Sequence, residues 1–235
     1  MRVLIIIPAY NEECNIRSVI QDLKSHCCEH DILVVNDCST DNTSDILSEL
    51  KVTHLNLTVN LGIGGAVQAG YLYAKKNHYD AAVQFDGDGQ HKAEYIHSLI
   101  GPLAKDTADI VIGSRFIEKK GFQSSAIRRT GINYLSSLIN WLSGVEVKDV
   151  TSGMRAVNRK MIEFYARDYA QDFPEPEAIL SAGLHNARIA EIPVEMKERT
   201  SGKSSINTLK SVYYMIKVSL ALILSSISME KKHDQ

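Results

Sequence analysis

The chain has 235 residues, of which 44% are hydrophobic and 23% are charged, as expected for a globular protein with a full core. Its net charge of -2 at pH 7 gives no global positive field, which argues against nucleic acid as a partner. Four cysteines, all within the first forty residues, form no CxxC pair, so we expect reduced thiols and a cytoplasmic protein.

The first half of the chain alternates short Val- and Ile-rich runs with longer amphipathic segments. The first run, 3–7, is too short for a signal peptide and is interpreted as a buried strand. Further strands are expected at 31–35, 52–57, 81–85 and 110–113, and helices at 12–25 (capped by Asn11), 43–50, 65–76 and 93–104. This pattern predicts an α/β fold with one open, mostly parallel sheet, whose ligands bind beyond the carboxyl ends of the strands.

The second half contains fewer regular signals. We expect loops at 119–125 and 199–205, a helix at 127–142, and strands at 153–158 and 188–197, the last near a sheet edge because of Pro193. No linker or repeat divides the chain, so one catalytic domain is expected over 1–206, followed by a C-terminal helical segment over 207–235.

The C-terminal segment has an apolar part, 212–227, which is shorter than the roughly 20 residues of a bilayer span. Three interpretations remain open. It forms a helix on the protein's own core, a helix that binds a partner subunit, or a helix at the membrane interface. The membrane interpretation is supported by Lys210, Lys217 and the lysine pair at 231–232.

Two carboxylates, Asp86 and Asp88, follow the predicted strand 81–85 directly and alternate with glycines. Carboxylate oxygens at a strand end are suited to hold Mg²⁺ or Mn²⁺ against the phosphates of a nucleotide. Gln90 and His91 follow as further candidate ligands. The alternative is a β-turn, because Asp-Gly is a common turn dipeptide.

Asp37 stands at the end of another predicted strand, where its carboxylate can accept hydrogen bonds from a base or a ribose hydroxyl. The alternative is capping, because Ser39, Thr40 and Asp41 all favour turns. The glycine-rich stretch 62–66 has GxGG spacing and lacks the dinucleotide fingerprint, which argues against a dehydrogenase. Gly65 is instead predicted to let a base or sugar approach the backbone closely.

Basic residues concentrate after the strand at 110–113. Arginine is suited to grip phosphate with two hydrogen bonds, whereas a solvated surface is the alternative. The candidates are Arg115, Lys119, Lys120, Arg128, Arg129, Arg199 and Lys203.

Two acidic segments have open roles. Asp149 and Arg155 have opposite charges and are interpreted as a pair or as site residues. Glu175 and Glu177 lie in a Pro-Glu-Pro-Glu segment, where one of them acts as a general base or where they only begin a helix.

Together these segments resemble the family 2 glycosyltransferases, which have the GT-A fold. The resemblance covers about residues 3–206 and is carried by 7–12, 35–41, 60–62, 86–91 and 113–115. Within the family, 149–155 and 199–204 most resemble the dolichyl- and polyprenyl-phosphate sugar synthases.

The resemblance implies a role for each matching residue. Asp86 would lie by the ribose and the metal, and Asp88 and Gln90 would hold Mg²⁺ or Mn²⁺ on the donor diphosphate. The acceptor side would be formed by Arg115 and by Arg128 or Arg129. The nucleotide sugar would be bound by Pro8, Tyr10, Glu12 and Asp37, with Arg199 and Lys203 near its diphosphate.

The expected reaction is an inverting transfer of a sugar from a UDP- or GDP-sugar to a polyprenyl phosphate. Such an acceptor is already a nucleophile, whereas a saccharide hydroxyl would need Glu175 or Glu177 as base. A non-catalytic nucleotide-sugar module and a nucleotidyltransferase are the alternatives.

The surroundings of the enzyme are also open to expectation. The synthases often carry transmembrane helices after the catalytic domain, and this chain has only its apolar tail. The expected location is therefore peripheral, at the cytoplasmic face of the membrane, with a small membrane subunit or a second copy of the chain as candidate partners.

Overall fold

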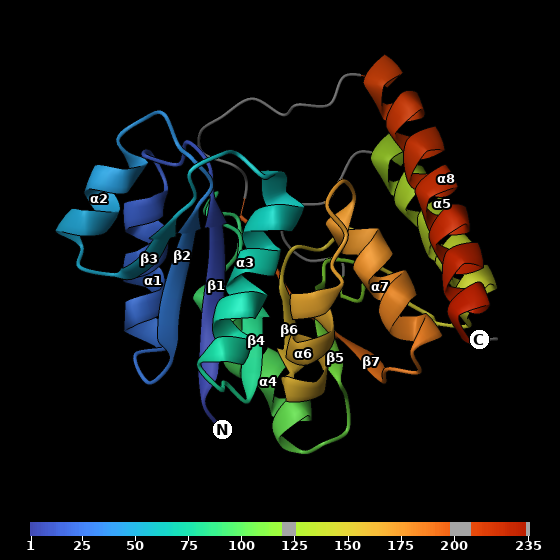
Figure 1. Ribbon diagram of the computed structural model, residues 1–235, viewed down its shortest axis with the longest axis horizontal. Helices are drawn as coiled ribbons and strands as arrows, with labels where there is room; N and C mark the ends of the chain where they lie inside the picture. Colours follow the sequence, from blue (N-terminus) through green and yellow to red (C-terminus); the bar gives the residue numbers. More distant parts are fainter. Residues whose placement is uncertain (119–125, 198–207, 234–235) are drawn as a thin grey trace.

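The fold is built on one seven-stranded sheet with the order β3-β2-β1-β4-β6-β5-β7 (Figure 1). The structure is a computed structural model that describes residues 1–118, 126–197 and 208–233. Its strands are β1 (Val3–Ala9), β2 (Asp31–Asn36), β3 (Thr53–Asn56), β4 (Ala81–Gln84), β5 (Ile110–Ser114), β6 (Arg155–Asn158) and β7 (Ile189–Pro193). β6 is antiparallel to β4 and β5, and the other neighbouring pairs are parallel. The predicted mostly parallel α/β sheet is confirmed.

Helices cover both faces of the sheet. One face packs against α1 (Ile16–His26), α2 (Thr43–Glu49), the short 3-10 helix η1 (Ala93–Tyr95) and α4 (Ile96–Ala104). The other face packs against α3 (Gly62–Lys76), α6 (Arg159–Arg167) and α7 (Pro174–Leu184). Two further helices, α5 (Ala126–Ser143) and α8 (Thr208–His233), lie side by side at the end of the molecule farthest from α2 (Figure 1).

The sequence of β1 explains its central place. All seven of its residues are buried, and successive apolar side chains pack alternately into the cores on the two faces of the sheet. Leu4 and Ile6 join the core under α3, whereas Ile5 and Ile7 join the core under α1. A continuous apolar run is what a strand covered on both faces requires.

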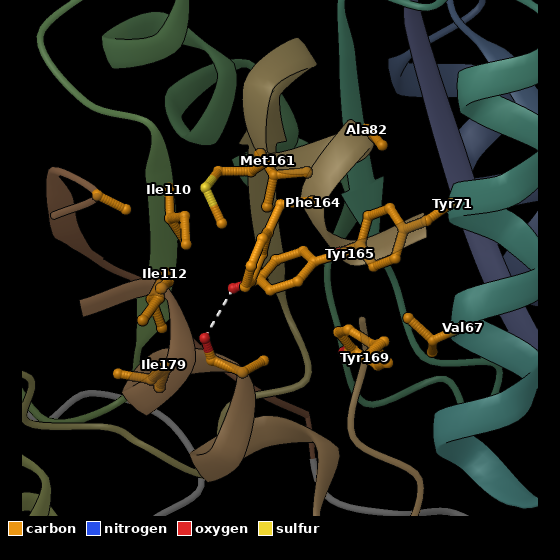
Figure 2. Close-up of a cluster of buried hydrophobic side chains, with 14 of the residues drawn as sticks. Val67, Tyr71, Ala82, Ile110, Ile112, Met161, Phe164, Tyr165, Tyr169 and Ile179 are labelled. Carbon is orange, nitrogen blue, oxygen red and sulfur yellow. Dashed lines mark hydrogen bonds between the residues drawn. The ribbon is translucent and has the colours of Figure 1, made fainter. Parts of the chain in front are cut away.

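A cluster of tyrosines joins α3 to the segment around α6 (Figure 2). Tyr71 lies 5.3 Å from Tyr165 and 5.4 Å from Tyr169, measured between ring centroids. The Tyr165 hydroxyl donates a hydrogen bond of 2.8 Å to the carbonyl of Ala178 in α7. Buried aromatic contacts of this kind stabilise a core beyond the area they bury. The Tyr169 hydroxyl lies 3.2 Å from Gln84 Oε1, which places this cluster beside the carboxyl end of β4.

Several predicted boundaries were wrong for local reasons. The first helix begins at Ile16 and not after Asn11, because Asn11 has a left-handed backbone (φ 55°) and its side chain accepts a hydrogen bond from the Thr40 amide. α3 begins at Gly62, three residues before the predicted start, and α6 had not been predicted. The edge position of Pro193 is confirmed, since β7 ends the sheet.

Candidate functional site

A cleft of about 530 Å³ opens at the carboxyl ends of β1, β2 and β4. This is the edge at which parallel α/β sheets bind their ligands. The cleft brings together six of the predicted site residues, which are Pro8, Tyr10, Glu12, Asp37, Asp86 and Asp88. Three strand ends far apart in the sequence therefore form one acidic hollow.

Asp37 organises one wall of the cleft. Its two carboxylate oxygens accept hydrogen bonds from the backbone amides of Leu61 (2.7 Å) and Gly62 (2.9 Å), at the start of α3. A carboxylate at a helix N-terminus satisfies amides that have no partner within the helix. Each oxygen keeps a second lone pair, so Asp37 can still accept a hydrogen bond from a ligand. The capping predicted for Asp41 is also present, since its Oδ1 accepts from the Thr43 amide and hydroxyl.

Asp86 is held rigidly at the floor of the cleft. His91 Nε2 lies 3.0 Å from Asp86 Oδ2, and the His91 side chain is 1% exposed. Gly153 leaves just enough room for this carboxylate, because a Cβ there would lie 2.2 Å from Asp86 Oδ2. Burial raises the pKa of Asp86, but the His91 hydrogen bond and the charge of Arg155 outweigh it and leave the pKa below its ordinary value. Asp86 is therefore an ionised carboxylate in a fixed position.

The side chains of Asp88 and Gln90 lie in different places. Asp88 lines the cleft, and its Oδ1 accepts a hydrogen bond from the backbone amide of Gln90. The Gln90 side chain instead reaches away to donate to the carbonyl of Lys197. Gln90 was predicted to hold the metal together with Asp88, and the structure does not bring it into the cleft.

Arg115 lies in a buried ion pair. Its guanidinium contacts both carboxylate oxygens of Asp149, at 2.7 and 2.6 Å, and the Thr151 hydroxyl. Both side chains are nearly inaccessible, at 8% and 0% exposure, so removing either would leave an uncompensated buried charge. The predicted Asp149–Arg155 pair was wrong, since Arg115 takes that place.

Arg155 is fully buried and ties two segments together. It donates hydrogen bonds to the carbonyls of Ser152 (2.6 Å) and Glu175 (3.2 Å). Its charge also lowers the pKa of the nearby Asp86 and Glu175 carboxyls. Sequence reasoning missed this linking role of Arg155, because the nearness of residues 152–155 to Asp86 appears only in the folded chain.

The two candidate bases face different surroundings. Burial, followed by the field of Asp86, raises the pKa of Glu175, and the charge of Arg155 opposes this rise. Burial also raises the pKa of Glu177, whose carboxylate accepts a hydrogen bond from Ser225 in α8. Glu175 thus lies within the field of Asp86, whereas Glu177 contacts α8. Both also lie in the first turn of α7, as the helix-start alternative predicted.

Arg128 and Arg129 lie in the first turns of α5. The Arg129 guanidinium carbon stacks 3.6 Å from the centroid of the Phe116 ring, a cation–π contact. Surrounding protein, followed by the charge of Arg115, lowers the pKa of Arg128. Tyr214 of α8 lies within the fields of both Arg128 and Glu175, and burial raises its pKa to about 12. The charges of these residues therefore influence one another in pairs: Arg128 with Tyr214, Tyr214 with Glu175, and Glu175 with Asp86.

One of the remaining predicted residues, Gly65, is described by the structure, and four are not. Gly65 does not line the cleft, and a Cβ there would meet Leu61 at 2.4 Å and Gln171 at 3.1 Å, so its small size serves packing. Lys119, Lys120, Arg199 and Lys203 lie outside the described residues.

The carboxylate oxygens of the cleft are suited to bind a hard divalent cation. Asp86 Oδ1 is buried and has no hydrogen-bond partner among the residues that the structure describes, and the Asp88 carboxylate lies on the same cleft. A buried carboxylate oxygen without a partner is costly unless something positive completes it. Oxygen-only ligands favour Mg²⁺ or Mn²⁺ over softer metals.

Comparisons with known proteins agree with this geometry. Residues 4–165 match the family model described as glycosyl transferase family 2. A UDP-N-acetylglucosamine–dolichyl-phosphate N-acetylglucosaminyltransferase from Methanococcus voltae is 32% identical over 82% of this chain and 84% of its own length. An undecaprenyl-phosphate mannosyltransferase from Micrococcus luteus is 32% identical over 88% of both chains.

The fold has a solved counterpart. The glucosyl-3-phosphoglycerate synthase of Mycobacterium tuberculosis, in complex with Mn²⁺, UDP and glucosyl-3-phosphoglycerate, matches with a TM-score of 0.72 and 20% identity. The match covers 96% of this chain and 79% of that one, and it identifies the GT-A fold. By the family match over most of its length, this chain belongs to the family 2 glycosyltransferases.

Proposed function

We propose that this enzyme moves a sugar, with inversion, from a nucleoside diphosphate sugar to a polyprenyl phosphate. The observation that carries the donor half is the cleft in which Asp37, Asp86 and Asp88 meet. The two relatives that act on dolichyl and undecaprenyl phosphates support the acceptor half. UDP and GDP are the candidate carriers.

Each carboxylate has its own task. Asp37 accepts from the base, and its fixed position at the start of α3 orients the nucleotide. Asp88, with the free oxygen of Asp86, holds Mg²⁺ or Mn²⁺. When bound, this cation supplies positive charge to the departing diphosphate. His91 keeps Asp86 aligned by donating to its second oxygen.

Arg128 is the proposed binding residue for the acceptor phosphate. Its charge interacts with Tyr214, Tyr214 interacts with Glu175, and Glu175 lies in the field of Asp86. A phosphate held there needs no base, because its oxygen is already a nucleophile and only has to be positioned. Arg115 is committed to a buried ion pair with Asp149, so Arg128 and not Arg115 is assigned to the acceptor.

The lipid is presented by the membrane surface, which we propose meets the α5–α8 end. Five large residues of α8 at helical spacing are 46–64% exposed and form an apolar stripe: Tyr213, Ile216, Leu220, Leu224 and Ile227. Trp141 of α5, the helix that packs against α8, is 78% exposed. The opposite face of α8 buries Val218 and Leu222 in the core.

This arrangement supports a helix lying in the interface plane, with tryptophan and tyrosine at the headgroup level. Among the described helices, none has the length and apolar character to cross a bilayer. The enzyme is therefore proposed to work as a peripheral protein at the cytoplasmic face of the membrane. A small membrane subunit or a second copy of the chain are the alternative occupants of the stripe.

A saccharide hydroxyl is the second candidate acceptor. It is favoured by the raised pKa of Glu175, whose causes are burial first and the field of Asp86 second. A carboxyl tuned in this way suits a general base. Glu177 is a weaker candidate, because it faces Ser225 of α8.

The donor half is tested by thermal unfolding with nucleotide sugars and Mn²⁺. A ligand that binds only the folded state raises the melting temperature. We expect one nucleotide sugar to stabilise the wild type and to do so much less in Asp88→Asn. Release of nucleoside diphosphate on adding acceptor would support transfer. Formation of pyrophosphate from a nucleoside triphosphate and a sugar phosphate would instead indicate a nucleotidyltransferase and overturn the proposal.

A further inference from the structure

Away from the cleft, three potential metal ligands converge where the end of α1 meets the start of α4. Glu29 and His30 lie in the turn between α1 and β2, and His97 lies on α4. One ligand atom from each lies within 4.8 Å of the other two. None of these residues lines the donor cleft, and the transfer reaction uses none of them.

The spacing matches a tetrahedral zinc ion. Glu29 Oε1 is 3.5 Å from His30 Nε2 and 3.4 Å from His97 Nε2. With bonds of about 2.0–2.1 Å, neighbouring ligands of tetrahedral zinc lie roughly 3.3–3.4 Å apart. Two edges of the coordination polyhedron are therefore present within a few tenths of an ångström.

His30 supplies a second, independent observation. The His30 side chain is only 12% exposed, and its Nε2 is buried and has no hydrogen-bond partner among the described residues. A ring nitrogen sealed from water without a partner is unfavourable, and a metal ion would satisfy it. Glu29 supplies a carboxylate oxygen that lies close to the ring nitrogens of both histidines.

Two contacts join the end of α1, which precedes Glu29 and His30, to the segment that carries His97. The thiol of Cys27, which is fully buried, contacts the carbonyl of Ala93 just before α4, at 3.7 Å. His97 Nε2 lies 3.2 Å from the His26 carbonyl, so its lone pair becomes available only when the ring proton moves to Nδ1. Metal binding therefore exchanges one exposed hydrogen bond for a coordinate bond.

We propose that Glu29, His30 and His97 form a binding site for Zn²⁺, with water in the fourth position. Two imidazoles and one carboxylate favour a first-row transition metal, whereas the oxygen ligands of Asp86 and Asp88 favour Mg²⁺ or Mn²⁺. A bound ion would clamp the turn after α1 to α4, the helix that follows the Asp86–His91 loop. The expected role is to stabilise that region, so the inference does not depend on the transfer reaction.

The test is thermal unfolding of the chelator-stripped full chain with Zn²⁺ alone, in excess Mg²⁺ to occupy the oxygen-only site. At about 100 times Kd, Zn²⁺ should raise the melting temperature by roughly 5–10 °C. His30→Gln and His97→Gln should each weaken the zinc affinity about tenfold or more. Glu29→His, which supplies another ring nitrogen, should retain binding.

The matched control is His78→Asn. His78 is an exposed histidine elsewhere, and asparagine tolerates its left-handed backbone (φ 57°). This variant should respond to Zn²⁺ like the wild type. An unchanged zinc response in His30→Gln and His97→Gln, or no response in the wild type, would overturn the proposal. Neither result bears on nucleotide-sugar binding, which is measured separately.

Discussion

Gly153→Ala tests whether the position of Asp86 controls the reaction. A Cβ at residue 153 would lie 2.2 Å from Asp86 Oδ2 and 2.7 Å from its Oδ1, whereas ordinary contacts begin at 3.4 Å. The carboxylate must therefore move by about 1 Å, and His91 and the surrounding burial leave it little freedom. A displacement of about 1 Å in a positioning group costs on the order of 10²-fold in rate. Overpacking should also cost about 1–3 kcal/mol of stability.

The assay is nucleoside diphosphate release against Mn²⁺ concentration, with circular dichroism to verify folding. We expect a loss of about 10²-fold in kcat/KM and a higher Mn²⁺ requirement. Gly101→Ala is the matched control, because a Cβ there meets nothing within 4 Å and the residue lies within α4. That variant should keep wild-type activity. A folded Gly153→Ala enzyme within about threefold of the wild-type rate would refute the reasoning.

Four further outcomes follow from the structure. Asp37→Asn should raise the KM for the donor and lower the free energy of unfolding by about 1–3 kcal/mol in urea, because one capped amide loses its partner. Glu175→Gln should slow transfer by about 10²–10⁴-fold only if the acceptor is a hydroxyl, and Glu177→Gln should be mild in either case. Leu220→Ser with Leu224→Ser should reduce sedimentation with anionic vesicles, whereas Leu72→Ser, equally exposed on α3, should not. The Arg188 hydrogen bond holds the pKa of Asp109 at about 2, below its unfolded value, so this carboxylate contributes about 2 kcal/mol above pH of about 4. That contribution disappears as the pH falls toward about 2, and Asp109→Asn should flatten this part of a urea-unfolding pH profile.

The sequence predicted the fold well wherever apolar runs stood between turn residues. β1, β2 and β4 are such runs, and their carboxyl ends carry Pro8, Asp37 and Asp86 into the cleft. Parallel pairing brings these ends together, so the cleft itself followed from the pattern.

The acceptor side could not be predicted in the same way. Arg115 follows β5 directly and looked like a free cation, but a carboxylate 34 residues away, Asp149, accepts hydrogen bonds from its Nε and Nη2. Which acid meets which base depends on tertiary packing and not on sequence spacing. The same holds for Glu175 and Glu177, two residues apart, which helical geometry directs to different neighbours.

Beside the cleft, tertiary contacts also override the local conformational preferences of the sequence. Asn11 is a good helix cap, yet it adopts a left-handed backbone and its side chain accepts a hydrogen bond from the Thr40 backbone amide. This conformation keeps the residues before Ile16 out of the helix. Cys38, on the facing loop, has a left-handed backbone as well (φ 60°). Strained loop residues of this kind are common beside binding sites, where the fold over-determines them.

The most direct test of the central claim is transfer of labelled sugar to a polyprenyl phosphate. The substrates are the nucleotide sugar that stabilises the protein, Mn²⁺, and vesicles containing either the polyprenyl phosphate or the matching polyprenol. We expect a labelled lipid from the phosphate alone, and we expect this product to be lost in Asp88→Asn and strongly reduced in Arg128→Ala. Labelling of the polyprenol, or of a saccharide with no labelling of the lipid phosphate, would contradict this expectation.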